Sequence, residues 1–203
     1  NMTKLFKLSV FFSLAFISLI NFLNAEPFES TYTPLPSQNI LIKNANIYDG
    51  EGNELLKTDL LIKDRKIAAI GNDLPVTDDF EVIDASGKWV TPGIIDIHSH
   101  MGVYPAPGVR TSSDGNEATS PVTADVWAEH SIWVQDPQYT LALSGGVTAF
   151  HILPGSANLI GGRGVTVKNL QRNTINSMKF PEAPHSLKMA CGENPKRVYG
   201  NRQ

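Results

Sequence analysis

The sequence predicts a small all-β unit followed by a parallel α/β sheet or barrel. Residues 39–92 hold short strand-like runs with turn residues between them, at the spacing of about 8–12 residues that is typical of β-sandwiches. Pro92-Gly93 then opens a more apolar strand that we expect to be buried, and a helix followed at once by another strand comes later. Strand, helix and strand in succession form the repeating unit of parallel sheets.

Alternating apolar residues and polar turns define the first unit. Its strands are expected near Ile40–Tyr48, Leu55–Ile62 and Lys66–Ile70, with a further strand in residues 81–90. The turns between them are Asp49-Gly50-Glu51-Gly52, Asp64-Arg65 and Ser86-Gly87. We expect residues 39–92 to be the N-terminal part of a composite β-sandwich domain.

The second unit, residues 93–203, alternates strands with a helix. Asp136 is the expected N-cap of that helix, Pro137 its first turn and Gly145 its end, and a strand Val147–Ile152 follows. "GGRGVTVKN" predicts a third strand and "HSLKMACG" a fourth. Residues 103–131 are polar and rich in Pro and Gly, which predicts a long loop above the strand ends.

Composition and charge exclude some classes of protein. The chain has 203 residues, of which 41% are hydrophobic and 18% charged, so it is ordinary globular material. Its net charge of −3 comes without a basic stripe, and we therefore expect no nucleic-acid partner. Cys191 is the only cysteine, so no internal disulfide can form.

The first 25 residues resemble a secretory signal peptide. Lys4 and Lys7 precede an apolar stretch from Leu8 to Leu23, and Ala25 is a plausible cleavage residue. We expect an exported protein, periplasmic or secreted, with no membrane association after cleavage and with residues 26–38 as a linker. The alternative is an uncleaved anchor, although the stretch is shorter than the roughly 20 residues of a membrane span.

The stretch "WVTPGIIDIHSHMG" carries the strongest chemical signal. On a strand, Asp96, His98 and His100 share one face and Ile95 and Ile97 the other. Two imidazoles at one strand end form half of a tetrahedral zinc-type site. Asp96 lies two residues deeper, where we expect it to orient or pack. A pair of satisfied histidines at a strand terminus is the alternative interpretation.

These motifs resemble the amidohydrolase superfamily, in particular its imidazolonepropionase-like branch. The similarity runs from about Asn39 to the end of the sequence and is most specific from Val82 to Gly102. It is strong again at "GGVTAFHILPGSANLIGGRGVTVK" and "KMACGENPKRVYG". The resemblance implies a (β/α)8 TIM-type barrel, of which only the first strands are present, with a metal centre at its C-terminal face.

The resemblance also implies a set of metal ligands. His98 and His100 match the first two, and the cofactor would be zinc or a similar divalent metal, as one or two ions. In binuclear members a carboxylated lysine of the fourth strand bridges both metals. Lys188 is the similar position and Lys168 its competitor, and an ordinary surface lysine, which would leave a mononuclear site, is the other alternative.

The family's later ligands have no counterpart in this sequence. Two histidines from the fifth and sixth strands and an aspartate from the eighth are expected beyond its end. The residues from Gly93 to Gln203 are fewer than half of the roughly 250 of a typical barrel. We therefore expect the 203-residue chain alone to be inactive and poorly folded, with an open sheet edge that favours aggregation or pairing with another chain, including a homo-oligomer.

Three further residues are candidates for binding substrate. The glycine-rich loop "PGSANLIGGRG", Pro154–Gly164, follows a strand, so we expect it on the catalytic face. Its glycines would allow the backbone to approach a ligand closely, with Asn158 and Arg163 as polar contacts. Glycines that simply permit a tight loop are the alternative. His151, near the end of the second strand, could reach the site, although a packed or solvent-facing histidine is the more common case.

The predicted function is metal-dependent hydrolysis of carbon–nitrogen bonds in a peptide or small-molecule amide or cyclic amide. The metal would activate water and polarise the carbonyl, while an acid/base residue carries a proton to the leaving nitrogen. The alternative is a non-catalytic scaffold or binding protein on the same fold. Two convergent imidazoles argue against a scaffold.

Overall fold

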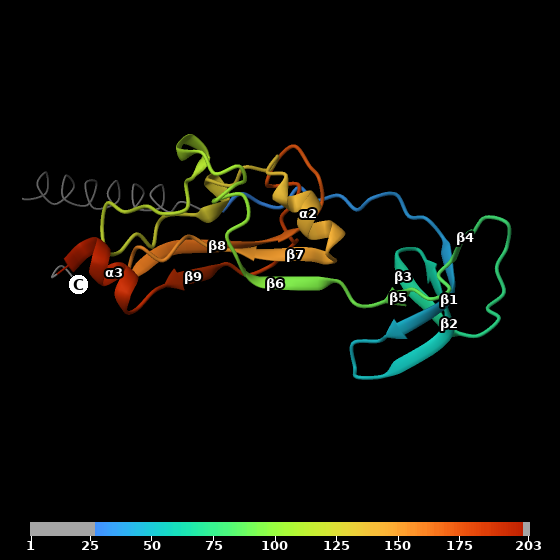
Figure 1. Ribbon diagram of the computed structural model, residues 1–203. Coiled ribbons are helices and arrows are strands. Elements are labelled where there is room, and N and C mark those ends of the chain that lie inside the picture. Colours follow the sequence, from blue (N-terminus) through green and yellow to red (C-terminus); the bar gives the residue numbers. More distant parts are fainter. Residues whose placement is uncertain (1–26, 201–203) are drawn as a thin grey trace, which may run out of the picture.

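The computed structural model describes residues 27–200, which form two β-sheets (Figure 1). The predicted signal segment, residues 1–25, lies outside the described residues. No helix within residues 27–200 has the length and apolar character needed to span a bilayer.

The first sheet is built around β1, Ile40–Tyr48. Antiparallel neighbours follow on one side in the order β1, β2 (Glu54–Lys63), β3 (Lys66–Gly71). On its other side β1 pairs in parallel with two short strands, β4 (Glu81–Asp84) and β5 (Trp89–Val90). The all-β prediction for this region is therefore confirmed, in the form of one five-stranded sheet.

The turn between β1 and β2 is fixed by one carboxylate. Asp49 Oδ1 accepts hydrogen bonds from the N–H groups of Glu51, at 2.8 Å, and Asn53, at 3.1 Å. Gly50, with φ of +83°, takes the left-handed conformation that glycine tolerates best. The core beneath the sheet is small and consists of Ala45, Ile47, Leu60 and Ala85.

The second sheet has the order β6 (Ile94–Ser99), β7 (Val147–Ile152), β8 (Ile160–Lys168), β9 (Ser186–Met189). β6 and β7 are parallel, and the helix α2 (Gln138–Ser144) lies in the connection between them. This confirms the predicted strand, helix and strand unit. Figure 1 shows α2 on one side of the sheet.

β8 departs from the predicted parallel sheet, because it runs antiparallel to both β7 and β9. Only residues 153–159 connect β7 to β8, whereas a parallel crossover needs about a dozen residues or more. A hairpin is thus the arrangement that this connection allows. β9 runs in the same direction as β6 and β7, and the four strands form an open sheet.

The strand β6 is more exposed than its apolar sequence suggests. Ile95 is 62% exposed and Ile97 77%, because β6 pairs only with β7 among the described strands. The prediction of a buried strand is therefore wrong for this part of the chain. The core lies instead around β7, β8 and α2, with Val103, Tyr139, Phe150, Ile152, Val165, Val167 and Met178 as its buried cluster.

The predicted helix cap and long loop are both present. Asp136 Oδ1 accepts the N–H of Gln138 at 3.0 Å, and Oδ2 accepts the N–H of Gly102 at 3.2 Å, so this buried carboxylate joins the start of α2 to the end of β6. Residues 103–131 are irregular apart from two short 3₁₀ helices, η1 (Arg110–Ser112) and η2 (Ala128–His130). The bridges from Val122 to Ile160 and from Trp127 to Arg163 place part of this loop along β8.

The predicted linker is attached to the second sheet's unit over its first residues. Phe28 donates its N–H to Glu129 Oε1 at 3.2 Å, and its carbonyl accepts from the Lys179 ammonium. Lys179 Nζ and Glu129 Oε2 form a buried ion pair at 2.7 Å. Thr31 donates its N–H to the carbonyl of Asn176 at 2.9 Å. We call residues 27–33, which make these contacts, the N-terminal strap.

Candidate functional site

The two histidines of the motif lie together at the C-terminal end of β6. Their ring centroids are 5.5 Å apart and the planes are nearly perpendicular, at 82°. Asp96 does not reach the imidazoles through a recorded hydrogen bond; its Oδ1 accepts the backbone N–H of His98 at 3.0 Å. This contact holds the backbone at His98, and a role of Asp96 in orienting the imidazoles stays a prediction.

The tautomer of His100 is set by a backbone carbonyl. Nδ1 of His100 lies 2.8 Å from the carbonyl oxygen of Leu153, which follows β7. A carbonyl only accepts hydrogen bonds, so Nδ1 carries the proton and the lone pair of the neutral ring is on Nε2. A metal-ligating histidine typically has its other ring nitrogen bonded in this way.

Lys188, on β9, is brought directly to the histidine pair. Its Nζ lies 3.0 Å from Nε2 of His98, within hydrogen-bonding distance, and the residue is only 8% exposed. The nearby charge of Lys188 lowers the pKa of His98, and burial and the charge of His100 lower it further. The charge of Asp96 raises this pKa, but by less. Burial lowers the pKa of Lys188. Both shifts favour the neutral forms, which are the forms that bind metals.

Lys168, the competing lysine, lies elsewhere. Its Nζ sits 4.0 Å from the ring centroid of Phe180 and 5.0 Å from that of Tyr32. Lys168 is the last residue of β8 and lies in the half of that strand that pairs with β7. Lys188 lies on β9, which pairs with the other half of β8, residues 160–164. Of the two lysines, the structure places only Lys188 against a histidine of the motif.

His151, predicted near the end of the second strand, faces the same hollow as His98 and Lys188. This open hollow has a volume of about 430 Å³ and is lined by His98, His151, Leu153, Ser186, Leu187, Lys188 and Met189. His151 Nε2 lies 2.6 Å from Ser186 Oγ, and Nδ1 lies 2.9 Å from Thr166 Oγ1. Burial lowers the pKa of His151, with further contributions from His185 and His98.

The structure gives Asn158 and Arg163 contacts within the protein. Asn158 is 1% exposed, and its amide donates to the carbonyls of Glu117 and Ser120 in the long loop. Arg163 donates from Nε to the carbonyl of Ala124 at 3.1 Å and lies over the Trp127 ring. Both side chains hold the loop against β8, and their contact with substrate stays a prediction.

The segment predicted as a glycine-rich loop is partly strand. β8 begins at Ile160, so Arg163 lies within a strand and the loop ends at residue 159. A Cβ at Gly162 would lie 2.7 Å from the carbonyl oxygen of Val126. The glycines therefore allow the long loop to pack closely against β8. This agrees with the interpretation that the glycines permit tight packing of the chain, rather than with close approach of the backbone to a ligand.

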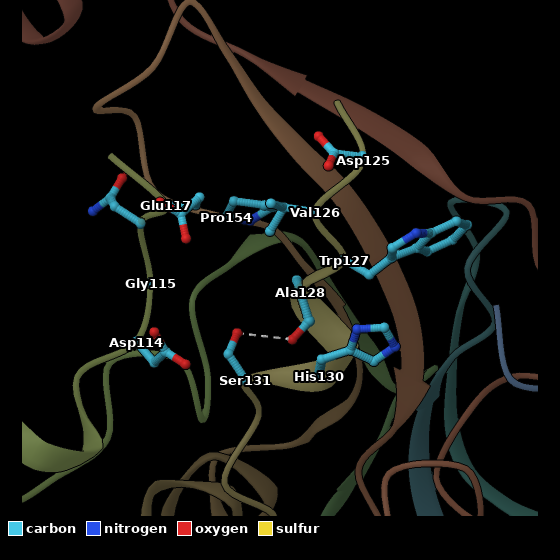
Figure 2. A pocket seen from close by; sticks show the side chains of 11 residues that line it. Asp114, Gly115, Glu117, Asp125, Val126, Trp127, Ala128, His130, Ser131 and Pro154 are labelled. Carbon is cyan, nitrogen blue, oxygen red and sulfur yellow. Dashed lines mark hydrogen bonds between the residues drawn. The ribbon is translucent and has the colours of Figure 1, made fainter. Parts of the chain in front are cut away.

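A second pocket, of about 310 Å³, was not found from the sequence (Figure 2). Its polar lining includes Asp114, Glu117, Asp125 and His130, all within the region that the sequence marks only as a polar loop. Pro154 also lines it and directly follows Leu153 of the first hollow. Long-range folding of the loop creates this pocket, and no local motif signals it.

Within residues 27–200 no cluster of three or more His, Cys, Asp or Glu side chains is arranged to hold a metal. The observed arrangement is two imidazoles and one lysine. One imidazole, that of His100, has its tautomer fixed for binding through Nε2. These donors fit part of the coordination shell of a zinc-like ion.

Comparison with known proteins defines the class of the chain. It is 36% identical over 188 residues to amidohydrolase tasK of Hapsidospora irregularis, covering 80% of this chain and 19% of the relative. It is 46% identical over 74 residues to a dihydroorotase of Lactobacillus helveticus, covering 36% of this chain and 16% of that protein. No protein-family model matches.

Among solved structures, an amidohydrolase from Thermotoga maritima is similar, with a TM-score of 0.73 and 41% identity. The similarity covers 80% of this chain and 42% of that one. The chain thus spans less than half the length of each of these relatives. The chain belongs to the amidohydrolase superfamily, as its motifs predicted.

Proposed function

We propose that this chain supplies His98, His100 and Lys188 to the metal centre of a hydrolase that cleaves carbon–nitrogen bonds. The observation that carries the proposal is the convergence of these three side chains, with Lys188 Nζ 3.0 Å from His98 Nε2. Membership of the amidohydrolase superfamily supports the same assignment. A zinc-like ion supplies, when bound, an acidified water and a polarised carbonyl.

Each residue has a distinct task in this proposal. His100 binds through Nε2 while the Leu153 carbonyl keeps its ring oriented. His98 binds through a ring nitrogen whose basicity its neighbours reduce, so it is neutral and available at neutral pH. Lys188 is the third donor. The hollow of about 430 Å³ beside these residues is where a substrate would lie.

A carboxylated Lys188 would complete a bridge between two metals. Its neutral amine would attack the carbon of CO₂ and release a proton, which gives a carbamate with two oxygen donors. Burial lowers the pKa of Lys188 and thereby increases the neutral fraction that this step needs. With an unmodified lysine the centre would be mononuclear.

We also propose that the second sheet belongs to a (β/α)8 barrel. β6, β7 and β9 run in one direction, and the likeness to the Thermotoga amidohydrolase supports this. In that arrangement β8 is a hairpin strand set between barrel strands. The metal centre then lies at the C-terminal end of β6, the face where barrels place their chemistry.

The proposed substrates are peptides and cyclic amides. The name of the Lactobacillus relative, dihydroorotase, favours a cyclic amide, whereas that of the Hapsidospora relative leaves the amide open. A non-catalytic binding protein on the same fold is the second candidate. The placement of a buried lysine against the histidine pair favours the enzyme, because a scaffold gains nothing from burying that amine.

Hydrolysis and the role of Lys188 are tested together. The protein tested here and below, called the complete protein, is a version extended to the full length of its relatives. Loaded with zinc, it is expected to hydrolyse members of a panel of dipeptides and cyclic amides, measured by product chromatography. Lys188→Met should weaken zinc binding by at least about tenfold, because it removes a donor, and should abolish turnover. Lys168→Met is the matched control and should behave as the parent. Turnover that survives Lys188→Met would contradict the role given to Lys188. Zinc binding with no turnover of any substrate would contradict the enzyme assignment.

Export is a separate proposal, supported by the charged and apolar pattern of residues 1–25. We expect the mature protein to begin at or near Glu26 in a periplasmic or secreted fraction. N-terminal sequencing of the protein from that fraction measures this directly. An intact Met2 terminus in a membrane fraction would indicate an anchor instead.

A further inference from the structure

A side-chain hydrogen bond joins two strands that are not neighbours in the second sheet. His151 belongs to β7 and Ser186 to β9, and β8 lies between these strands. Nevertheless, Nε2 of His151 lies 2.6 Å from Oγ of Ser186. The other ring nitrogen is held by Thr166 of β8, at 2.9 Å. The imidazole therefore contacts both strands beyond its own.

A glycine in β8 leaves the room for this contact. Gly164 is paired with Ser186 in the β8–β9 register. A Cβ at Gly164 would lie 2.6 Å from Ser186 Oγ and 2.6 Å from Leu153 Cδ2. Both distances are far inside van der Waals contact, so a larger residue would displace the serine or the leucine. The missing side chain lets His151 reach across β8.

The bridge lies one step away from the proposed lysine ligand. Ser186 and Lys188 are two residues apart on the strand β9, and alternating residues of a strand share a face. β9 is short, with four residues, and β8 is its only partner strand among those described. Any tie that fixes Ser186 therefore also fixes the face and the depth of Lys188, whose Nζ lies against His98.

We infer that His151 and Ser186 form a positioning pair that sets Lys188 against His98 and so shapes the metal centre. This inference rests on the proposed function. It assigns His151 a positioning role in place of the substrate contact expected from the sequence. Outer partners of this kind typically change metal affinity by about 10–100-fold when they are removed.

The test is a double-mutant cycle in the complete protein, with zinc affinity as its measurement. Ser186→Ala and His151→Ala are each expected to weaken zinc binding by about tenfold. The double variant should also lose about tenfold, because both single changes remove the same bond. Ser144→Ala, which removes an exposed serine hydroxyl on α2 that bonds Leu141, is the control and should bind zinc as the parent does.

A spectroscopic measurement separates positioning from general stability. With Co²⁺ in place of zinc, the visible absorption bands report the ligand geometry, and Ser186→Ala should shift them in the same direction as Lys188→Met. Unchanged spectra and unchanged affinity in Ser186→Ala, or additive losses of about a hundredfold in the double variant, would overturn the inference. If the parent itself binds no zinc, the proposed function fails. If the parent binds zinc and the Ser186→Ala variant matches it, the proposed function stands and only the positioning role of His151 and Ser186 fails.

Discussion

Replacing both His98 and His100 with alanine is expected to abolish zinc binding by the complete protein. The two imidazoles lie with ring centroids 5.5 Å apart at one strand end, and Lys188, the proposed third donor, lies beside them. A catalytic zinc needs about three protein ligands, and a single lysine cannot hold it. Metal content after dialysis, measured by mass spectrometry, should fall below roughly a tenth of the parent's value.

The control for this experiment is His130→Ala. His130 is also an imidazole, but its Nε2 lies 3.8 Å from Glu129 and it lines the second pocket rather than the first hollow. This variant should retain the metal content of the parent. If the double histidine variant kept full stoichiometry, the assignment of the metal centre to β6 would be wrong, whatever the activity of the protein.

Removing the buried cation of the Lys179–Glu129 ion pair, to which the N-terminal strap is bound, is expected to destabilise the protein strongly. Lys179 and Glu129 are 5% and 2% exposed, and their charged atoms are 2.7 Å apart. Lys179→Met leaves the Glu129 carboxylate buried, with the Phe28 N–H as its hydrogen-bond donor and His130 Nε2 3.8 Å away. The free energy of unfolding, from urea denaturation, should fall by about 3–5 kcal/mol.

Two further variants show whether the isolated charge is the cause. Lys179→Met combined with Glu129→Leu should lose less stability than Lys179→Met alone, because no unpaired charge remains in the interior. Lys196→Met removes an exposed lysine and should change stability by less than about 0.5 kcal/mol. A single variant as stable as the parent would mean that water reaches the pair in solution.

The sequence predicted the local elements well because their signals are local. Alternation and polar turns located β1 to β3, and the Asp136 cap with the Gly145 stop located α2 to within one or two residues. β7 begins and ends where the pattern predicted it, at Val147 and Ile152. The pairing of His98 with His100 follows from strand geometry alone.

Features that depend on distant parts of the chain were not predicted. The antiparallel direction of β8 follows from the short connection of residues 153–159, which the glycine pattern had suggested was a longer loop. The ion pair of Glu129 with Lys179 joins residues 50 positions apart, and neither residue stands in a motif. The contact of His151 with Ser186 likewise needs the register of three strands. The motifs read from single strands do not fix which residues lie opposite one another across three strands.

The direction of β8 also affects the order in which the second sheet can assemble. The β7–β8 hairpin closes a loop of residues 153–159, whereas β6 reaches β7 only across residues 100–146. The longer closure costs roughly 1.5–2 kcal/mol more in chain entropy, and contacts between distant residues form more slowly than local ones. β6 therefore adds to a hairpin that already exists, and it carries His98 and His100 with it. The proposed metal ligands are therefore expected to come together in a late step of folding.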